Sequence, residues 1–200
     1  MSERRVVLAT GNPGKLRQFS ELMGELGFTL VRQSDFGIKP PAETGTTFLE
    51  NALIKARNAA SITGLPAIAD DSGIEVDALE GRPGLYSARY AGEGASDLAN
   101  LEKMLRELEN VPAERRGARY RSVIVYIAHA ADPAPLVGEG VWAGSIAEAP
   151  RGTDGFGYDP IFLPRGDSRT AAEMPAAERN ARSHRGQAWH QFLARFGTRG

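Results

Sequence analysis

Two adjacent carboxylates are the residues of this chain most suited to chemistry. The segment Asp70–Gly73 reads Asp-Asp-Ser-Gly and follows an apolar run, Leu65–Ala69. Neighbouring carboxylates at the end of a strand point in different directions, so one can bind a metal ion while the other orients it or activates water. Holding them together costs repulsion unless a cation or a shared proton relieves it. The pair predicts the acidic centre of a metal-dependent enzyme, with Glu43 as a further oxygen ligand; an Asx turn at Asp71 is the alternative.

A glycine-rich turn with a lysine, Thr10–Lys15, lies between an apolar run and an amphipathic one. Glycines let the backbone approach a ligand, the first N–H groups of a helix attract anions, and Lys15 adds a positive charge, so the turn suits a phosphate. The spacing is not that of a P-loop, because Gly11 and Gly14 are separated by two residues and Leu16 follows the lysine. A tight strand–helix turn with a solvated lysine is the alternative.

Two later segments carry groups suited to a purine ring. In Gly152–Pro160, three glycines surround Phe156 and Tyr158, and flat rings beside an open backbone suit base stacking. The proline after Asp159 favours an extended backbone there, which directs the carboxylate. Ser183–Arg185 brings a histidine and an arginine to the start of the last expected helix, where donors can serve a carbonyl or a phosphate oxygen. The alternatives are core-filling aromatic rings and a capped helix with solvated side chains.

The composition is that of an ordinary globular protein and excludes several kinds of site. The chain has 200 residues, of which 42% are hydrophobic and 24% charged, and a formal net charge of -1. No overall basic field attracts nucleic acid or an anionic membrane, so we expect neither as a partner. The absence of cysteine excludes disulfides, thiolate metal sites and cysteine nucleophiles. The apolar run near the N-terminus is too short for a signal peptide or a membrane span, so we expect a soluble, cytoplasmic protein.

Periodicity and turn residues predict alternating strands and helices. Strands are expected at Val6–Ala9, Phe28–Val31, Leu65–Ala69 and Ile74–Leu79, and an antiparallel pair at Tyr120–Ala130 and Leu136–Ile146. Helices are expected at residues 16–26 and from Thr47 to Gly64, the second with a capping box at its start. Two more helices are expected, one starting near Ser96 and one after Ser183 as its N-cap, and a glycine-rich loop is expected over 81–94. This alternation favours an α/β protein with a mixed sheet.

In combination, these segments resemble the inosine triphosphate pyrophosphatase family over essentially the whole chain. The resemblance is carried, in order, by Val7–Lys15, Glu43–Ala52, Asp70–Gly73, Gly84–Tyr90, Gly155–Pro160 and Ser183–Arg185. It implies a single domain over residues 1–200, with an elongated mixed β-sheet, flanking helices and two lobes around a central cleft. It further implies a homodimer that uses Mg²⁺ to hydrolyse the triphosphates ITP, dITP and XTP to the monophosphate and pyrophosphate.

The same resemblance implies roles for individual residues. Asp71 would be the general base, and the metal ligands would be Glu43, Asp70 and Asp71. The substrate-binding residues would be Thr10, Gly11, Asn12, Pro13, Gly14, Lys15, Lys55, Ser72, Phe156, Gly157, Tyr158, Asp159, Arg179, His184 and Arg185. Arg179 is a departure, since the family generally has a lysine there, and arginine spreads its charge over a planar fork.

Two other functions fit the same residues less well. A related pyrophosphatase could act on modified pyrimidine nucleotides instead of purines. A nucleotide-binding regulator could keep the ligand site without turnover, but binding alone does not need a water-activating base beside two more carboxylates.

Overall fold

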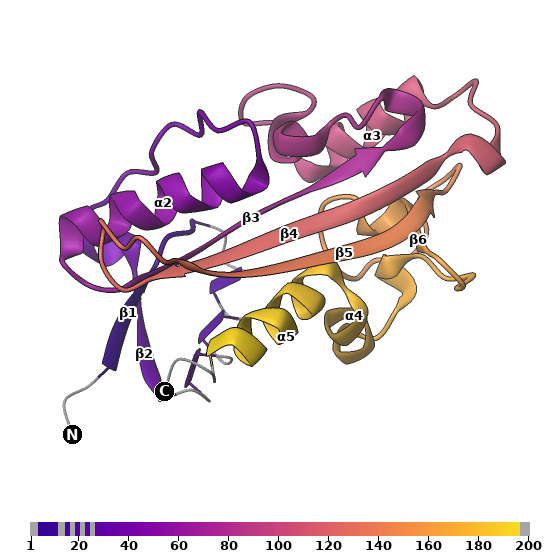
Figure 1. Ribbon diagram of the computed structural model, residues 1–200. Coiled ribbons are helices and arrows are strands. Elements are labelled where there is room, and N and C mark those ends of the chain that lie inside the picture. The colour runs from indigo at the N-terminus through magenta and orange to yellow at the C-terminus, as the bar shows by residue number, and fades with distance from the viewer. Residues whose placement is uncertain (1–3, 12–14, 17–18, 21–22, 25–26, 197–200) are drawn as a thin grey trace. The chain divides into compact units, whose positions relative to one another are not determined.

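The structure is a computed structural model that describes residues 4–11, 15–16, 19–20, 23–24 and 27–196. Figure 1 shows its strands and helices: β1 (Arg4–Leu8), β2 (Phe28–Arg32), α2 (Phe48–Thr63), β3 (Ala67–Val76), α3 (Asp97–Glu107), β4 (Gly117–Ile127), β5 (Leu136–Ile146), β6 (Phe162–Pro164), α4 (Ala176–Arg182) and α5 (His184–Phe196). The strands form a six-stranded sheet in the order β2-β1-β3-β4-β5-β6. Within these described ranges, no helix is both long and apolar enough to cross a membrane.

The sheet is mixed, as the alternation of elements predicts. Strand β1 pairs in parallel with β2 and with β3, while β5 pairs antiparallel with β6. Parallel neighbours require crossover connections, and helical residues between β1 and β2, and helix α2 between β2 and β3, supply them. The predicted α/β class with flanking helices is confirmed.

The ends of the long helices lie where local signals place them. Thr47 is the N-cap of α2, and its hydroxyl accepts a hydrogen bond from the Glu50 N–H, while the Glu50 carboxylate accepts from the backbone N–H of Thr47. The helix ends before Gly64, whose φ of 68° is a left-handed conformation that glycine adopts at low cost. Ser96 caps α3 in the same way through the Ala99 N–H. These helix boundaries are confirmed.

Two expectations are wrong, one helix is not predicted, and a further expectation is tested only in part. Residues 67–69 and 74–76 of the strands expected at Leu65–Ala69 and Ile74–Leu79 belong to one strand, β3, which runs through the acidic segment, and Asp77–Leu79 is a 3₁₀ helix. The loop expected over 81–94 contains a 3₁₀ helix at Gly84–Arg89, and α4 is not predicted because its residues lack an apolar stripe. Of the helix expected at 16–26, the described residues 16, 19–20 and 23–24 are helical, and the others lie outside the described residues.

The chain divides into two compact units, of which the first comprises residues 1–71, 123–138 and 191–200. In this unit, α2 packs against β1, and Val6 and Val7 of β1 are fully buried. The rings of Phe28, Tyr126 and Phe196 meet edge to face, with centroids 5.6 to 6.4 Å apart. This unit carries Thr10, Lys15, Glu43, Lys55 and both aspartates of the acidic segment.

The second unit comprises residues 72–122 and 139–190 and has its own core. Leu101 and Met104 of α3 belong to it together with Trp142 of β5 and Phe162 of β6, whose rings lie 5.2 Å apart. This unit carries Ser72, the segment Gly152–Pro160, and the arginines and histidine of the last predicted site.

A buried arginine joins the C-terminal end of α3 to the strand β5. Arg116 is 5% exposed, and its guanidinium donates to the carbonyls of Leu108, Val111 and Ala147 at 2.8, 2.9 and 3.2 Å. A cation at the C-terminus of a helix also opposes the negative end of the helix dipole. One side chain therefore satisfies three carbonyls from two parts of the second unit.

We expect Arg116→Met to lower the free energy of unfolding by about 2 to 4 kcal/mol, because the apolar stem stays buried while the carbonyls lose their donors. Urea denaturation followed by circular dichroism measures this. The neighbouring Arg115 is exposed, so Arg115→Met is the matched control and should change stability by less than about 0.5 kcal/mol. Equal effects of the two substitutions would contradict the assigned role of Arg116.

Candidate active site

The acidic segment lies inside a strand and not in a turn. Asp70 and Asp71 are the fourth and fifth residues of β3 and are 1% and 8% exposed. Successive side chains of a strand point to opposite faces, and here the two carboxylates meet different lysines, Lys15 and Lys55. The Asx turn weighed as an alternative is therefore wrong, whereas the expectation that the two carboxylates diverge is correct.

Asp70 forms an ion pair with the lysine of the glycine-rich turn. The Lys15 Nζ lies 2.6 Å from Asp70 Oδ2, and the two side chains are 14% and 0% exposed. Lys15 is the first described helical residue after the turn, and the ion pair fixes its ammonium group beside β3. Thr10 and Gly11 follow β1 after one intervening residue, Ala9, and the predicted phosphate contacts at Asn12, Pro13 and Gly14 lie outside the described residues.

Asp71 shares a lysine with Glu43. The Lys55 Nζ, projecting from α2, lies 2.7 Å from Asp71 Oδ1 and 3.1 Å from Glu43 Oε1. Burial opposes the charged form of Lys55, but the carboxylates of Asp71, Asp70 and Glu43 outweigh it and raise the pKa of this lysine. Lys55 is therefore a charged lysine held in ion pairs with two carboxylates, and not a lysine surrounded by solvent.

The environment of Asp71 makes its carboxylate more basic than a free aspartate. Burial raises the pKa of Asp71, and the nearby Glu43 carboxylate raises it further, while Lys55 only partly offsets both effects. A general base gains proton affinity from such a shift. The raised pKa of Asp71 is compatible with its predicted role, which stays a prediction.

Two carboxylates of the first unit are of the chemical type that binds Mg²⁺ together with phosphate. Among the residues that the structure describes, no three or more His, Cys, Asp or Glu side chains lie close enough together to hold a metal ion by themselves. Glu43 and Asp71 nevertheless converge on one ammonium group, and two carboxylates with phosphate oxygens and water are a usual ligand set for Mg²⁺. Asp70 is paired with Lys15, so its predicted metal contact stays a prediction.

In the second unit, an exposed aromatic ring is stacked with an arginine. The Phe156 ring is 44% exposed, and the Arg185 guanidinium carbon lies 4.7 Å from its centroid. The same guanidinium donates to the Ser72 hydroxyl at 3.3 Å. The structure thus brings together three predicted site residues that are far apart in the sequence.

Asp159 holds the backbone of the aromatic loop. Its Oδ2 accepts the Phe156 N–H at 3.2 Å, and its Oδ1 accepts the Tyr120 hydroxyl at 3.4 Å. Gly155 has a φ of +82°, and a Cβ there would lie 2.2 Å from the Asp159 carboxylate, so this position requires glycine. Burial raises the pKa of Asp159, although the Phe156 N–H and the arginines 185 and 179 act in the opposite direction.

His184 is buried beside the same carboxylate-bound tyrosine. Its ring is 3% exposed and stacks on Tyr120 with centroids 4.6 Å apart and an interplanar angle of 6°. The Ser183 hydroxyl accepts the Gly186 N–H at 3.2 Å, which confirms Ser183 as the N-cap of α5. The start of α5 therefore holds a histidine and an arginine in fixed positions.

A protein-family model decides what kind of protein carries these residues. The model of the Ham1 family matches residues 6–195. The chain belongs to the Ham1 family. It is 57% identical over 190 residues to the dITP/XTP pyrophosphatase of Yersinia pseudotuberculosis serotype I (strain IP32953), covering 95% of this chain and 96% of that protein. It is 54% identical to the dITP/XTP pyrophosphatase of Escherichia coli (strain K12), with the same coverage.

The fold agrees with a solved Ham1 structure. A HAM1 protein from Coxiella burnetii superposes with a TM-score of 0.91 at 47% sequence identity, covering 98% of this chain and 99% of that chain. The family membership predicted from the motifs is therefore confirmed, as is the mixed sheet with flanking helices.

In this Ham1 chain the departure at position 179 has a visible structural basis. Arg179, on α4, donates from Nη1 to the carbonyls of Ala171 and Met174, at 3.3 Å each, and its Nε lies 3.9 Å from Asp159 Oδ2. The planar guanidinium serves several oxygens at once, which a single ammonium group cannot do in the same geometry.

Two residues in contact with predicted site residues were not identified from the sequence, and the surroundings of a third were misjudged. Tyr120 is predicted from the sequence only as a strand residue, and Asp97, whose Oδ2 accepts the Gly157 N–H at 2.9 Å, is not singled out. Tyr158, predicted to contact substrate, is 4% exposed, and its hydroxyl donates to the Ser87 carbonyl at 2.8 Å. A polar residue at the first position of a helix is a signal that could have identified Asp97.

The raised pKa of Asp159 has a consequence for stability against pH. As the pH rises above the ordinary carboxyl pKa of about 4, this carboxyl loses its proton more readily in the unfolded chain than in the folded one, so its contribution to the free energy of unfolding falls. We expect the stability of the unsubstituted protein relative to Asp159→Asn to decrease over this range in urea denaturation.

The control is Asp154→Asn, the same change at an exposed position of the same loop. An advantage over Asp159→Asn that grows with pH would mean that the two arginines outweigh burial at Asp159.

Proposed function

We propose that this chain hydrolyses the non-canonical purine nucleoside triphosphates ITP, dITP and XTP to the monophosphate and pyrophosphate, and so removes them from the nucleotide pool. Relatives with 54% and 57% identity carry the name dITP/XTP pyrophosphatase, which supports this substrate class. The observation that carries the mechanism is the buried Asp71 carboxylate beside Lys55 and Glu43.

The first unit supplies cations for the triphosphate. Lys15 and Lys55 are each held by a carboxylate, so their ammonium groups are already oriented before a ligand binds. Cleavage between the α and β phosphates develops negative charge on the leaving pyrophosphate, and fixed cations stabilise that charge at little reorganisation cost. Thr10 and the turn that follows it would contribute backbone and hydroxyl donors.

Asp71 would act as the general base. It takes a proton from water, the water oxygen bonds to the α-phosphorus, and the bond from that phosphorus to the bridging oxygen breaks to release pyrophosphate. The raised pKa of Asp71 favours this proton transfer, and Lys55 keeps the carboxylate oriented.

Mg²⁺ belongs to the proposal as a cofactor. Glu43 and Asp71 would hold it together with phosphate oxygens, and Asp70 would assist by orienting Lys15. When bound, the ion would neutralise charge on the phosphates and polarise the reacting phosphorus.

The second unit would recognise the base. The exposed surface of the Phe156 ring would stack on the purine, and Arg185, His184 and the loop N–H groups would supply donors. Hypoxanthine and xanthine have a 6-oxo acceptor where adenine has an amino donor. A site of fixed donors can reject the wrong group by about 10⁴-fold, because the unmatched donors lose their partners.

The resemblance that suggests this activity also implies a cytoplasmic homodimer, and we include both in the proposal. Such an enzyme would act on the pool of free nucleotides. Analytical ultracentrifugation at the enzyme concentrations used in assays would determine the oligomeric state.

The decisive experiment is pyrophosphate release from a panel of triphosphates with Mg²⁺. We expect turnover of ITP, dITP and XTP and little turnover of ATP or of pyrimidine triphosphates. Asp71→Asn should lower kcat by about 10²- to 10⁴-fold, because the amide cannot accept the proton. Asp35→Asn, at an exposed position of the same unit, is the matched control. Preference for a pyrimidine triphosphate would overturn the proposed substrate class. If the unsubstituted protein turns over ITP no faster than Asp71→Asn does, the chain is better explained as a nucleotide-binding regulator.

A second expectation concerns the base platform. Phe156→Ala should raise KM for dITP by about 5- to 150-fold, the range that corresponds to a stacking contribution of about 1 to 3 kcal/mol, with a smaller effect on kcat. Phe36→Ala is the matched control, since Phe36 is 40% exposed in the first unit. A loss confined to kcat would contradict a binding role for the ring.

A further inference from the structure

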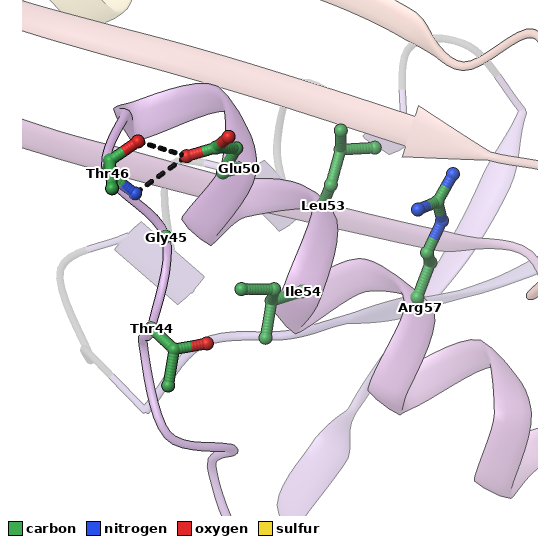
Figure 2. A pocket seen from close by; sticks show the side chains of 7 residues that line it. All are labelled: Thr44, Gly45, Thr46, Glu50, Leu53, Ile54 and Arg57. Carbon is green, nitrogen blue, oxygen red and sulfur yellow. Dashed lines mark hydrogen bonds between the residues drawn. The ribbon is translucent and has the colours of Figure 1, made fainter.

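The segment that carries Glu43 is tied to the first turn of α2. Thr46 donates to Glu50 Oε2 from its backbone N–H at 2.6 Å and from its hydroxyl at 2.8 Å, and Figure 2 shows both bonds. The Thr47 N–H donates to the same oxygen at 3.0 Å. These bonds fix the last residues before the helix, but Glu43 lies three residues further from it.

A second tie lies closer to Glu43. The Gly45 N–H donates to Asn51 Oδ1 at 2.9 Å, and Asn51 is 1% exposed. A Cβ at Gly45 would lie 2.6 Å from the Glu50 Cβ and 2.7 Å from Asn51 Oδ1, closer than side-chain atoms approach. Position 45 therefore requires glycine because its backbone is seated on the helix, not because of its φ.

The anchor and the catalytic cation share one face of α2. Asn51 and Lys55 are four residues apart, which places their side chains one above the other on a helix. Lys55 meets Glu43 at 3.1 Å, and Asn51 holds the backbone two residues after Glu43. The segment from Glu43 to Gly45 therefore contacts α2 at two points: Gly45 at Asn51, and Glu43 at Lys55.

We infer that Asn51 and Gly45 are positioning residues that hold the Glu43 carboxylate beside Lys55. The catalytic meaning of this anchor rests on the proposed function, whereas the anchoring itself does not. Without the Asn51 acceptor, or with a methyl group at position 45, the backbone of residues 43–45 moves away from α2. The Glu43 carboxylate then no longer lies beside Lys55.

The test compares Gly45→Ala and Asn51→Ala, alone and combined with Glu43→Gln. Displacement of a group by about 1 Å can cost about 10²-fold in rate, so we expect kcat/KM for dITP to fall by about 10- to 100-fold in each single variant. In the Glu43→Gln background the same changes should cost less than about 2-fold, because the group they position is already lost. Additive losses would overturn the inference.

Gly24→Ala is the matched control for the added methyl group. Gly24 is exposed, its φ is not left-handed, and a Cβ there meets nothing within 4 Å. Its activity should equal that of the unsubstituted protein. Thermal melting identifies any variant that fails to fold, and Asn51→Ser then replaces Asn51→Ala as the milder loss of the acceptor.

Hydrogen exchange of residues 43–47 supplies a readout that does not depend on turnover. Both single variants should lose amide protection in this segment while residues in the middle of α2 keep theirs. Unchanged protection would overturn the anchor whatever the activity. If the unsubstituted protein does not hydrolyse dITP but the exchange pattern is as expected, the proposed function fails and the anchoring of the Glu43 segment stands.

Discussion

The ammonium group of Lys55 lies 2.7 Å from Asp71 and 3.1 Å from Glu43, and all three groups are largely removed from water. A buried carboxylate without a counter-charge costs several kcal/mol, and two adjacent ones cost more through repulsion. Strand β3 can therefore run through Asp70 and Asp71 only because each carboxylate meets a lysine of the same unit. The pairs that make the strand possible are also those that the proposed chemistry uses.

The geometry of a strand gives the two aspartates different roles. Because neighbouring side chains alternate between faces, Asp70 turns to Lys15 and Asp71 to Lys55. Asp70 thereby orients a cation of the glycine-rich turn, while Asp71 has the proton affinity that burial gives it. The alternation of side chains along the strand separates the Asp70 and Asp71 carboxylates without a turn in the backbone.

Features fixed by nearby residues were predictable from the sequence, and features fixed by distant contacts were not. Thr47, Glu50 and Gly64 determine both ends of α2 through bonds to the adjacent backbone, and the prediction is confirmed. Asp70 and Asp71 carry low strand propensity, and lysines from other elements pair with both of them within β3, so the predicted break between two strands is wrong.

In the candidate site, too, residues in local patterns were predictable and residues defined by distant contacts were not. The types and order of Lys15, Asp71, Phe156 and Arg185 indicated a nucleotide site, because these residues stand in recognisable local patterns. Tyr120 shows no such pattern; its importance arises from contacts with His184 and Asp159, which are distant in the sequence. Asn51 likewise resembles any polar residue of an amphipathic helix until Gly45 is seen to approach it.

Under the proposed function, base selectivity depends on donors that cannot turn away from an unsuitable ring. A mobile arginine would relieve an opposed amino group by changing rotamer, and the energetic penalty would disappear. Arg185 is held by the Phe156 ring and the Ser72 hydroxyl, and Arg179 by two backbone carbonyls. The loop that presents Phe156 is fixed in turn by Asp159 and by the glycine at 155. In the first unit the lysines are thus oriented by ion pairs with buried carboxylates. In the second unit Arg185 is oriented by a ring and a hydroxyl, and Arg179 by two carbonyls with Asp159 at 3.9 Å.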